Sequence, residues 1–485
     1  MRPPRHFILA CLLLPFAILA QPSGGPGLGI PAADSPRARG STTGAAPPRG
    51  SRASPELPAI APLGELHLGT LLEFPGTTSV GLATAFDKTC EYYYEYGETP
   101  GRLDSRTDRR VASAGSVSRD RIAGLAPGRV YSYRLAWRES TASSFSFGPP
   151  GRCATMKGPS RPFIFAIEAD PHLDGNSSAA VYERSLDLMG SDAPDFVIDL
   201  GDTAMTEKLA KDPATSVARF RLIRSYWDTI GGSAPFFMVA GNHDGEQGWL
   251  AGSGKPDSKE TTVLRRTWLV DAADAPGKDF SVQAPTVYSF EWGDALFIML
   301  DPYIAESSKP AEGWDWTLGK DQYDWLAAVL ARSKAPFRFV FIHHLVGGRG
   351  RDARGGADVA GYYEWGGRSM NGSDDFAAMR PGWPLPVSGL LASQGVTAVF
   401  HGHDHFYARD EREGIVYQEV PQPSLARGQA PRPEQLEEYG YSTGDFLPSP
   451  GYLRVSVSAD RSRVEYVRSS DGSVGASWDM VPRTR

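Results

Sequence analysis

The sequence predicts an α/β domain that is preceded by an all-β sandwich. From residue 163 onward, short apolar stretches alternate with segments whose apolar residues recur at helical spacing, which is the pattern of strands buried between helices. Between residues 63 and 156, short strand-like stretches are instead separated by Pro-Gly turns, as in a β-sandwich. A chain of 485 residues is long enough for two hydrophobic cores.

The first 62 residues lack the pattern of a globular core. Arg2 and Arg5 precede an apolar run that ends at residue 20, which predicts a signal peptide over residues 1–20. Residues 21–62 are rich in Pro, Gly, Ser, Ala and Arg and are expected to form a disordered linker. No later stretch approaches the roughly 18 apolar residues of a membrane span. We therefore expect a secreted or periplasmic protein that has no transmembrane segment once the signal is removed.

The charge balance argues against a nucleic-acid binder. The chain has 50 basic and 57 acidic residues and a formal net charge of −7, whereas binding through the phosphate backbone needs a basic face. A small phosphorylated substrate remains compatible with this charge, because bound metal ions can supply positive charge locally. The oligomeric state is left open.

Residues 63–156 are expected to form the sandwich. Strand-like alternation covers residues 66–71, 79–85, 91–96, 116–122 and 130–137. Residues 122–133 resemble the fibronectin type III pattern near its last strands, where a tyrosine packs into the core. Cys90 and Cys153 lie in this region, and two interpretations remain open for them: a disulfide, as in many exported proteins, or two small buried apolar side chains.

Residues 157–485 are expected to form the α/β domain. Apolar strands are predicted at residues 163–168, 196–200, 236–240, 296–300, 338–342 and 398–400. Helices are predicted between them, at residues 177–189, 216–229, 320–332 and 388–393. Residues 451–456 and 463–467 are expected to form an antiparallel pair that closes one sheet edge.

Polar motifs follow five of these strands and contain seven of the nine histidines. The motifs are Asp170-Pro171-His172, Gly201-Asp202, Gly241-Asn242-His243-Asp244, His343-His344 and His401-Gly402-His403-Asp404-His405. Loops at the carboxyl ends of strands in an α/β sheet converge, so these side chains should meet. Imidazoles, one amide oxygen and a carboxylate able to bridge are what two transition metals need, which predicts phosphoester hydrolysis. The candidate ligands are Asp170, His172, Asp202, Asn242, His343, His403 and His405.

The ordered series of motifs resembles the calcineurin-like metallophosphoesterases. The sandwich in front and the Val-x-x-His spacing are similar to purple acid phosphatases, and the resemblance covers roughly residues 63–485. It implies a four-layer αββα fold in which two sheets are flanked by helices. It also implies two divalent or mixed-valence ions of Fe, Mn or Zn. The implied activity is cleavage of phosphomonoesters or phosphodiesters by in-line attack of a metal-bridging hydroxide.

The resemblance also implies a role for each site residue. One metal would take Asp170, His172, Asp202 and His405, and the other would take Asp202, Asn242, His343 and His403, so that Asp202 bridges. His243 would lie beside the phosphate, where it could protonate the leaving group or stabilise charge. The chain departs from the family at Met205, where purple acid phosphatases have tyrosine and many other members have aspartate. The metal identity and the group that orients His243 are therefore left open.

The segment 345–383 follows His343 and has the composition of an inserted active-site loop. Its arginines could pair with phosphate oxygens and its aromatic residues could stack on a base or sugar, although a solvated loop would have the same composition. The candidate substrate-binding residues are His344, Arg349, Arg351, Tyr362 and Trp365. His401 and Asp244 are expected to be structural.

Two alternatives to a general phosphohydrolase remain open. A nucleotidase or cyclic-nucleotide phosphodiesterase would use the aromatic loop to bind a base. An extracellular binding or adhesion protein with a decayed enzyme domain would be expected to have lost ligands, whereas all seven candidate positions are filled.

Overall fold

The computed structural model describes residues 67–206, 212–244, 258–305, 312–350, 352–428 and 430–483. All of these residues belong to one compact unit, Ser54–Arg485. The expected signal peptide, the expected linker and Arg351 lie outside the described residues. Within the described part of the chain, no helix is both long enough and apolar enough to cross a membrane.

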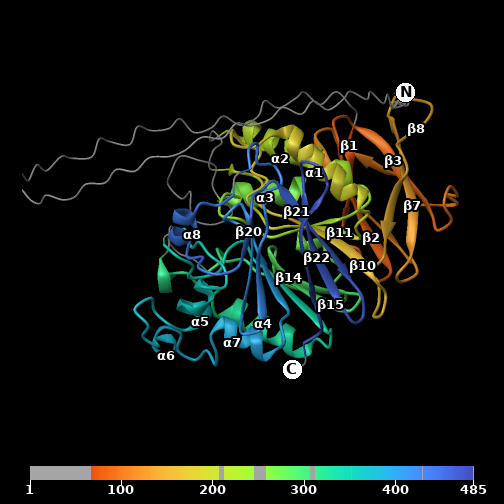
Figure 1. Cartoon of the computed structure of the whole chain (residues 1–485). Coiled ribbons are helices and arrows are strands. Elements are labelled where there is room, and N and C mark those ends of the chain that lie inside the picture. Colours follow the sequence, from red (N-terminus) through yellow and green to blue (C-terminus); the bar gives the residue numbers. More distant parts are fainter. Residues whose placement is uncertain are drawn as a thin grey trace, which may run out of the picture. The chain divides into compact units, whose positions relative to one another are not determined.

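The N-terminal part forms two β-sheets, drawn in orange at the right of Figure 1. The smaller sheet contains β1 (His67–Glu73), β2 (Ser79–Phe86) and β6 (Ser116–Ala123). The larger sheet contains β3 (Cys90–Gly97), β4 (Ser105–Arg106), β5 (Arg110–Ala112), β7 (Val130–Glu139), β8 (Ser146–Phe147) and β9 (Gly151–Ala154). Their facing side chains form one apolar core, which includes Leu82, Tyr94 and Leu135. The hydroxyl of Tyr131 accepts the Ala126 N–H at 2.9 Å, so this tyrosine packs as expected.

The two described cysteines are free thiols. In the sheet, Cys90 lies opposite Glu139 of β7, and Cys153 lies opposite Tyr131 of the same strand. Glu139 and Tyr131 are eight positions apart along β7. That separation is roughly 26 Å at about 3.3 Å per residue, far beyond the reach of a disulfide. The disulfide interpretation is therefore wrong. Burial raises the pKa of Cys90 to about 11 and that of Cys153 to about 12, as for inert core thiols.

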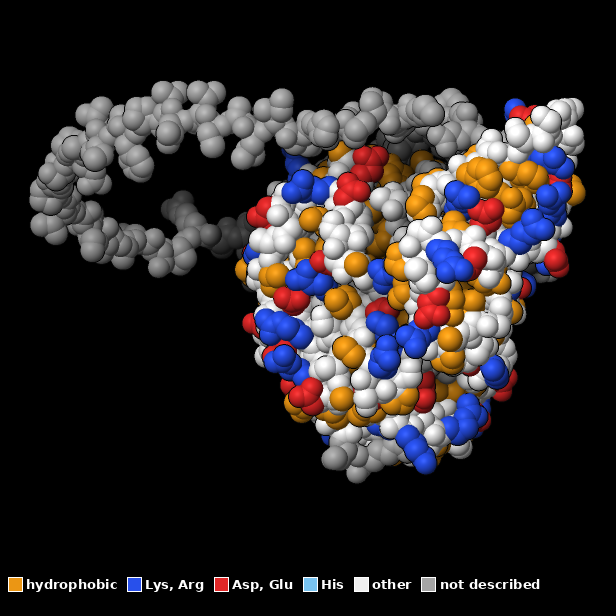
Figure 2. Space-filling model, turned by 90° about the vertical axis from the view of Figure 1, so that its right-hand side faces the viewer, with side chains coloured by type: hydrophobic (Ala, Val, Ile, Leu, Met, Phe, Trp, Pro, Cys, Tyr) orange, Lys and Arg blue, Asp and Glu red, His pale blue; other side chains and the backbone are white. Residues whose placement is uncertain are grey.

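Charged side chains of both signs are scattered over the face that carries this sandwich (Figure 2). Figure 2 shows lysine and arginine interspersed with aspartate and glutamate there. Several of these charges are paired across strands, for example Arg134 with Glu95 at 2.6 Å and Arg138 with Glu91 at 2.5 Å. Over the described residues in this view, the surface is mixed in charge.

Two mixed sheets form the centre of the rest of the chain. The first has the order β12-β11-β10-β21-β22-β23, and the second the order β13-β14-β15-β16-β17-β19-β18-β20. The first consists of β10 (Phe163–Glu168), β11 (Phe196–Asp199), β12 (Phe236–Met238), β21 (Gly451–Val457), β22 (Ser462–Arg468) and β23 (Val474–Met480). The second consists of β13 (Phe280–Ala284), β14 (Val287–Trp292), β15 (Ala295–Met299), β16 (Phe337–Phe341), β17 (Ala398–His401), β18 (Tyr407–Arg412), β19 (Ile415–Glu419) and β20 (Asp445–Leu447).

Aromatic side chains fill the space between these two sheets. Phe297 of the second sheet lies edge-on to Phe165 and Phe196 of the first, with ring centroids 5.1 and 5.2 Å apart. Phe237 stacks on Phe290 at 4.3 Å. On β15 the alternate residues Leu296 and Ile298 face away and join a second core. Because side chains alternate along each strand, one layer of apolar side chains lies between the two sheets and another lies on the outer face of the second sheet.

Helices cover both outer faces, which confirms the α/β fold and its helix–sheet–sheet–helix layering (Figure 1). On the first sheet lie α1 (Ala179–Ser191) and α2 (Pro213–Gly231), and on the second α4 (Lys320–Arg332) and α7 (Val387–Ser393). Asp212 caps α2 by accepting the N–H groups of Ala214 and Thr215, and Pro213 fits its first turn. The remaining described helices are α3 (Ser258–Trp268), α5 (Tyr363–Gly366), α6 (Phe376–Met379) and α8 (Pro433–Tyr439).

The C-terminal hairpin lies deeper in the sheet than predicted. β21 and β22 pair antiparallel as expected, but β21 also pairs with β10, and β23 rather than β22 forms the edge. The apolar residues of β21 explain this, since Leu453 and Val455 are fully buried in the central core. A strand buried in this way needs a hydrogen-bonded neighbour on each side.

Buried hydrogen bonds join the sandwich to α2 and the following loop. Arg224 of α2 is fully buried and donates to the carbonyls of Ala83 at 2.5 Å and Trp268 at 2.7 Å. The hydroxyl of Tyr133 donates to the Gly232 carbonyl at 2.8 Å. The sandwich is therefore attached directly to a helix that covers the first sheet.

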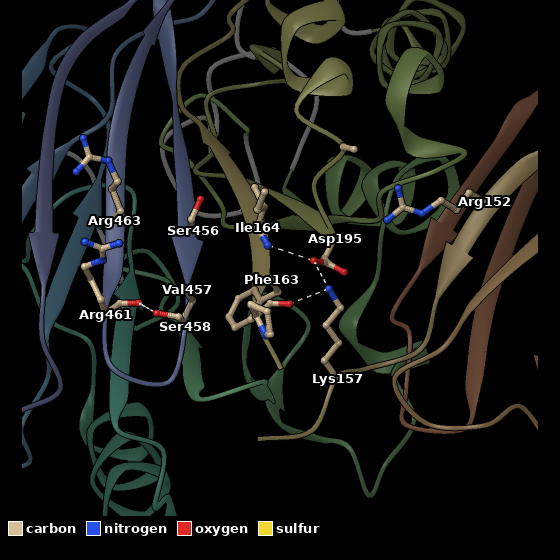
Figure 3. A pocket seen from close by; sticks show the side chains of 12 residues that line it. Arg152, Lys157, Phe163, Ile164, Asp195, Ser456, Val457, Ser458, Arg461 and Arg463 are labelled. Carbon is tan, nitrogen blue, oxygen red and sulfur yellow. Dashed lines mark hydrogen bonds and ion pairs between the residues drawn. The ribbon is translucent and has the colours of Figure 1, made fainter. Parts of the chain in front are cut away.

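An ion pair fixes the connection between β9 and β10. Figure 3 shows this region, a pocket of about 510 Å³ at the N-terminal end of β10. The metal-site motif that begins at Asp170 follows the other end of this strand. The Lys157 ammonium donates to Asp195 at 2.8 Å and to the Pro162 carbonyl at 3.1 Å. The same Asp195 oxygen accepts the N–H of Ile164 at 3.2 Å. The start of β10 is thereby held in place.

Replacing Lys157 by methionine should destabilise the fold, because it leaves the 5% exposed carboxylate of Asp195 without its cation. We expect the free energy of unfolding to fall by about 1–3 kcal/mol, measured by chemical denaturation. Lys88→Met is the control, because Lys88 forms an ion pair with Glu139 in which the two side chains are 60% and 44% exposed, respectively. That control should change stability by less than about 1 kcal/mol. Equal losses in the two variants would contradict the role of the Lys157–Asp195 pair.

Candidate metal centre

The structure brings the predicted ligands to one place, where the carboxyl ends of five strands meet. β10 leads to Asp170 and His172, β11 to Asp202, β12 to Asn242, β16 to His343, and β17 to His403 and His405. Two groups form there, and the ligand atoms within each lie within 4.8 Å of one another. The first group is Asp170, His172 and His405, and the second is Asp202, His343 and His403.

Asp202 lies between the two groups. Its Oδ2 is 3.3 Å from Nε2 of His343 in the second group and 3.7 Å from Nε2 of His172 in the first. Asn242 belongs with the second group, because its Oδ1 is 3.0 Å from the same His343 nitrogen. In the first group, Oδ1 of Asp170 is 3.3 Å from Nε2 of His405. The carboxylate of Asp202 is thus placed to serve both groups.

Main-chain carbonyls determine which imidazole nitrogens face the centre. Nδ1 of His343 lies 2.8 Å from the Leu200 carbonyl, and Nε2 of His403 lies 2.5 Å from the Asp352 carbonyl. Each of these nitrogens faces a carbonyl to which it can donate its N–H, so the other nitrogen of each ring faces the centre. Those two nitrogens lie 3.2 Å apart. Carbonyls commonly orient metal-binding histidines in this way.

Two buried polar atoms of the first group have no hydrogen-bond partner among the described residues. They are Oδ1 of Asp170 and Nε2 of His172, which lie 3.7 Å apart. A buried carboxylate oxygen and a buried ring nitrogen are costly unless an ion or a donor satisfies them. Together with the nitrogen and oxygen donors around them, they fit bound transition-metal ions.

The electrostatics of the centre keep its carboxylates ionised. Burial by itself would raise the pKa of Asp202, but the imidazoles of His343 and His243 hold that pKa well below its ordinary range. Burial disfavours the charged form of His343, yet the carboxylates of Asp202 and Asp170 raise its pKa to about 9. His172 behaves in the same way, and its pKa is also raised to about 9. Metal binding at these imidazoles must therefore displace protons.

Asp244 anchors the ligand loops, as expected from the sequence. Its carboxylate accepts four main-chain N–H groups at 2.8–3.0 Å, from Asp202, Thr203, Ala204 and Gly241. His401 is likewise structural, because it is buried and its Nδ1 lies 2.7 Å from the carboxylate of Glu419. The other oxygen of Glu419 accepts the N–H groups of Asp404 and His405 at 2.9 and 3.2 Å.

His243 lies at the edge of the centre and remains accessible. Its side chain is 34% exposed, and its Nε2 is 3.9 Å from Oδ2 of Asp202. The main-chain N–H of His243 donates to Oδ1 of Asp202 at 2.7 Å, so the residue is tied to the carboxylate that lies between the two groups. Its ring is edge-on to that of His172, with centroids 5.8 Å apart. Met205 is fully buried and carries no carboxylate or hydroxyl that could orient this ring.

The predicted substrate-binding residues that the structure describes do not gather at the centre. His344 is close to it but 2% exposed, packed against Trp316 and His403 with ring centroids 4.6 and 5.1 Å away. Trp365 is fully buried in the outer core, where its N–H donates to the Tyr417 hydroxyl at 3.1 Å. Arg349 and Tyr362 line a separate pocket of about 620 Å³ beside α8.

Arg354 is a residue beside the centre that the prediction missed. Its guanidinium donates to the main-chain carbonyl of His403 and, at 3.2 Å, to the carboxylate of Asp404. Burial and this guanidinium lower the pKa of His403 well below its ordinary value. Arg354 was visible in the sequence as one of several arginines of the inserted segment, but its spacing did not distinguish it from the others.

The chain matches a known protein family, and its fold is similar to those of solved structures. The family model described as calcineurin-like phosphoesterase matches residues 164–407, a range that contains all seven predicted ligands. A solved structure of PhoD is similar with a TM-score of 0.60 and 16% identity, covering 86% of this chain and 91% of that one. The purple acid phosphatase PPD1 from yellow lupin (Lupinus luteus) seeds is similar with a TM-score of 0.57 and 16% identity, covering 85% and 74%. The curated proteins gave no match.

Proposed function

Because the chain belongs to the calcineurin-like phosphoesterase family, we propose that it is an exported dimetal phosphohydrolase that cleaves phosphomonoesters or phosphodiesters. One observation carries the proposal: two groups of ligand-type residues adjoin each other, and the Asp202 carboxylate lies between them. Export rests on the apolar run that ends at residue 20.

The donor set divides into two metal sites that share one carboxylate. One site would consist of Asp170, His172, Asp202 and His405, and the other of Asp202, Asn242, His343 and His403. Bound metal ions would polarise the phosphoryl group, activate water and neutralise the charge that develops during attack. The nitrogen and oxygen donors suit Fe, Mn or Zn.

The chain's own side chains would complete the chemistry. His243 is half-exposed beside Asp202, so its Nε2 can donate a proton to the leaving-group oxygen of a bound ester. The carbonyls of Leu200 and Asp352 keep His343 and His403 in the tautomers that present a bare nitrogen to the site.

Among the described residues, no feature of the site favours either alternative function. A nucleotidase would need aromatic faces beside the metals, but Trp365 is buried and Tyr362 lines a different pocket. An adhesion protein with a decayed enzyme domain has no reason to keep six buried or half-buried ligand residues in two groups.

Hydrolysis of paired chromogenic monoester and diester substrates by the metal-loaded protein tests this function. We expect turnover of at least one substrate and its near loss in Asp202→Asn, with fewer bound metals per chain. The loss should exceed the roughly 100-fold effect of removing a residue that only supports a ligand. Asp192→Asn at the end of α1 is the control and should keep its metals. Near-normal turnover by a folded Asp202→Asn protein would disprove the dimetal assignment.

His243→Ala should reduce turnover by roughly 10²–10⁴ while both metals stay bound, because that range is typical of losing a general acid. The reduction should shrink for esters whose leaving groups are good, since these depart with little protonation. Steady-state rates across a series of leaving groups, together with metal analysis, measure both effects. Loss of metal, or equal rate losses across the series, would exclude the proton-donor role.

A further inference from the structure

Arg219 is a charged side chain in the interior of the protein. It lies in α2, is 1% exposed, and is followed on the same buried face by Phe220 and Ile223. A guanidinium in such a place is tolerated only where its N–H groups find acceptors. Its acceptors therefore indicate what this residue does.

The guanidinium donates to four main-chain carbonyls. Nε donates to Ala204 at 2.8 Å and Nη1 to Leu173 at 3.0 Å. Nη2 donates to His172 and, at 3.2 Å, to Thr203. Two of these carbonyls belong to the loop after β10 and two to the loop after β11. One side chain thus joins two loops that are about 30 residues apart in the sequence.

Both loops carry metal-site residues in a strained backbone conformation. His172 has a φ of 53° and Leu173 a φ of 51°, and in the other loop Asp202 has a φ of 57°. Such left-handed conformations are unfavourable for residues with a side chain and persist only where surrounding contacts fix them. The hydrogen bonds from Arg219 are contacts of this kind. In the first loop they hold the carbonyls of the strained residues His172 and Leu173. In the second loop they hold the carbonyl of Thr203, which follows Asp202 directly.

We propose that Arg219 is a positioning residue, which locks the two loops together and so presets His172 and Asp202 for metal binding. This inference rests on the proposed dimetal function. Arginine suits the task because its planar group offers five N–H donors, whereas lysine offers three from a single atom. Without Arg219 the loops can relax toward less strained conformations, and metal binding then has to order them.

Arg224 provides a matched control in the same helix. It is also fully buried, and it also donates to main-chain carbonyls, those of Ala83 and Trp268. Neither of these belongs to a loop that carries a metal ligand. Arg224→Met therefore reproduces the loss of a buried guanidinium from α2 without releasing the metal-site loops.

The test measures metal affinity separately from stability. Metal-free wild type, Arg219→Met, Arg219→Lys and Arg224→Met are titrated with Zn²⁺ and Mn²⁺ in competition with a chromogenic chelator. Melting temperatures are recorded in excess EDTA. Both methionine variants should melt at lower temperature, but Arg219→Met should bind metal roughly 10–100-fold more weakly, the range for losing a residue that supports a ligand. Arg224→Met should keep wild-type affinity, and saturating metal should restore turnover to Arg219→Met.

The possible outcomes separate this inference from the function on which it rests. A wild-type chain that binds no metal would overturn both. Wild-type binding together with unchanged or tighter binding in Arg219→Met, or equal weakening in Arg224→Met, would overturn the role of Arg219 alone. If Arg219→Met does not fold, Arg219→Lys decides, because it keeps the charge but cannot reach all four carbonyls. It should bind metal more weakly than wild type, and wild-type affinity would refute the proposal.

Discussion

The metal centre depends on loops that hold non-glycine residues in the left-handed backbone region. Five of the seven predicted ligands have positive φ, namely Asp170, His172, Asp202, His403 and His405. This conformation costs about 1–2 kcal/mol for each residue with a side chain. Buried carboxyl groups hold the loops by accepting their N–H groups: Asp244 accepts from Asp202 at 3.0 Å, and Glu419 accepts from His405 at 3.2 Å. A hydrogen bond to an ionised group contributes about 1.5–3 kcal/mol, which is comparable with the strain.

Positive charge from bound metal ions would favour the ionised forms of these anchoring groups. Burial raises the pKa of Asp244 and raises that of Glu419 well above its ordinary value, so burial alone disfavours their ionised forms. Metal ions next to them would favour the ionised carboxylates, which are the stronger acceptors. Loop geometry and metal binding should therefore stabilise each other. The α2 helix extends this coupling, because its Arg219 holds the ligand loops while its Arg224 holds the sandwich.

The sequence predicted the strands and the convergence of the polar motifs because both are encoded locally. Buried strands are continuous apolar runs, and the carboxyl ends of parallel strands converge, so position along the chain was enough to place Asp202. Contacts between distant segments were not predictable in this way. Trp365 lies in a glycine-rich segment that resembles a binding loop, yet its partner Tyr417 is 52 residues away. In the sequence, Arg219 cannot be distinguished from the other arginines of a helix, because its carbonyl partners lie in other segments. Likewise, no local signal places β21 beside β10.

The proposed function requires two metal ions that share Asp202. Anomalous diffraction from crystals of the metal-loaded protein, collected on both sides of the absorption edge of the bound metal, measures this most directly. We expect two anomalous peaks, one beside Asp170 and His405 and one beside His343 and His403, with the Asp202 carboxylate in contact with both. A single peak, or two peaks of which Asp202 contacts one or neither, would contradict it.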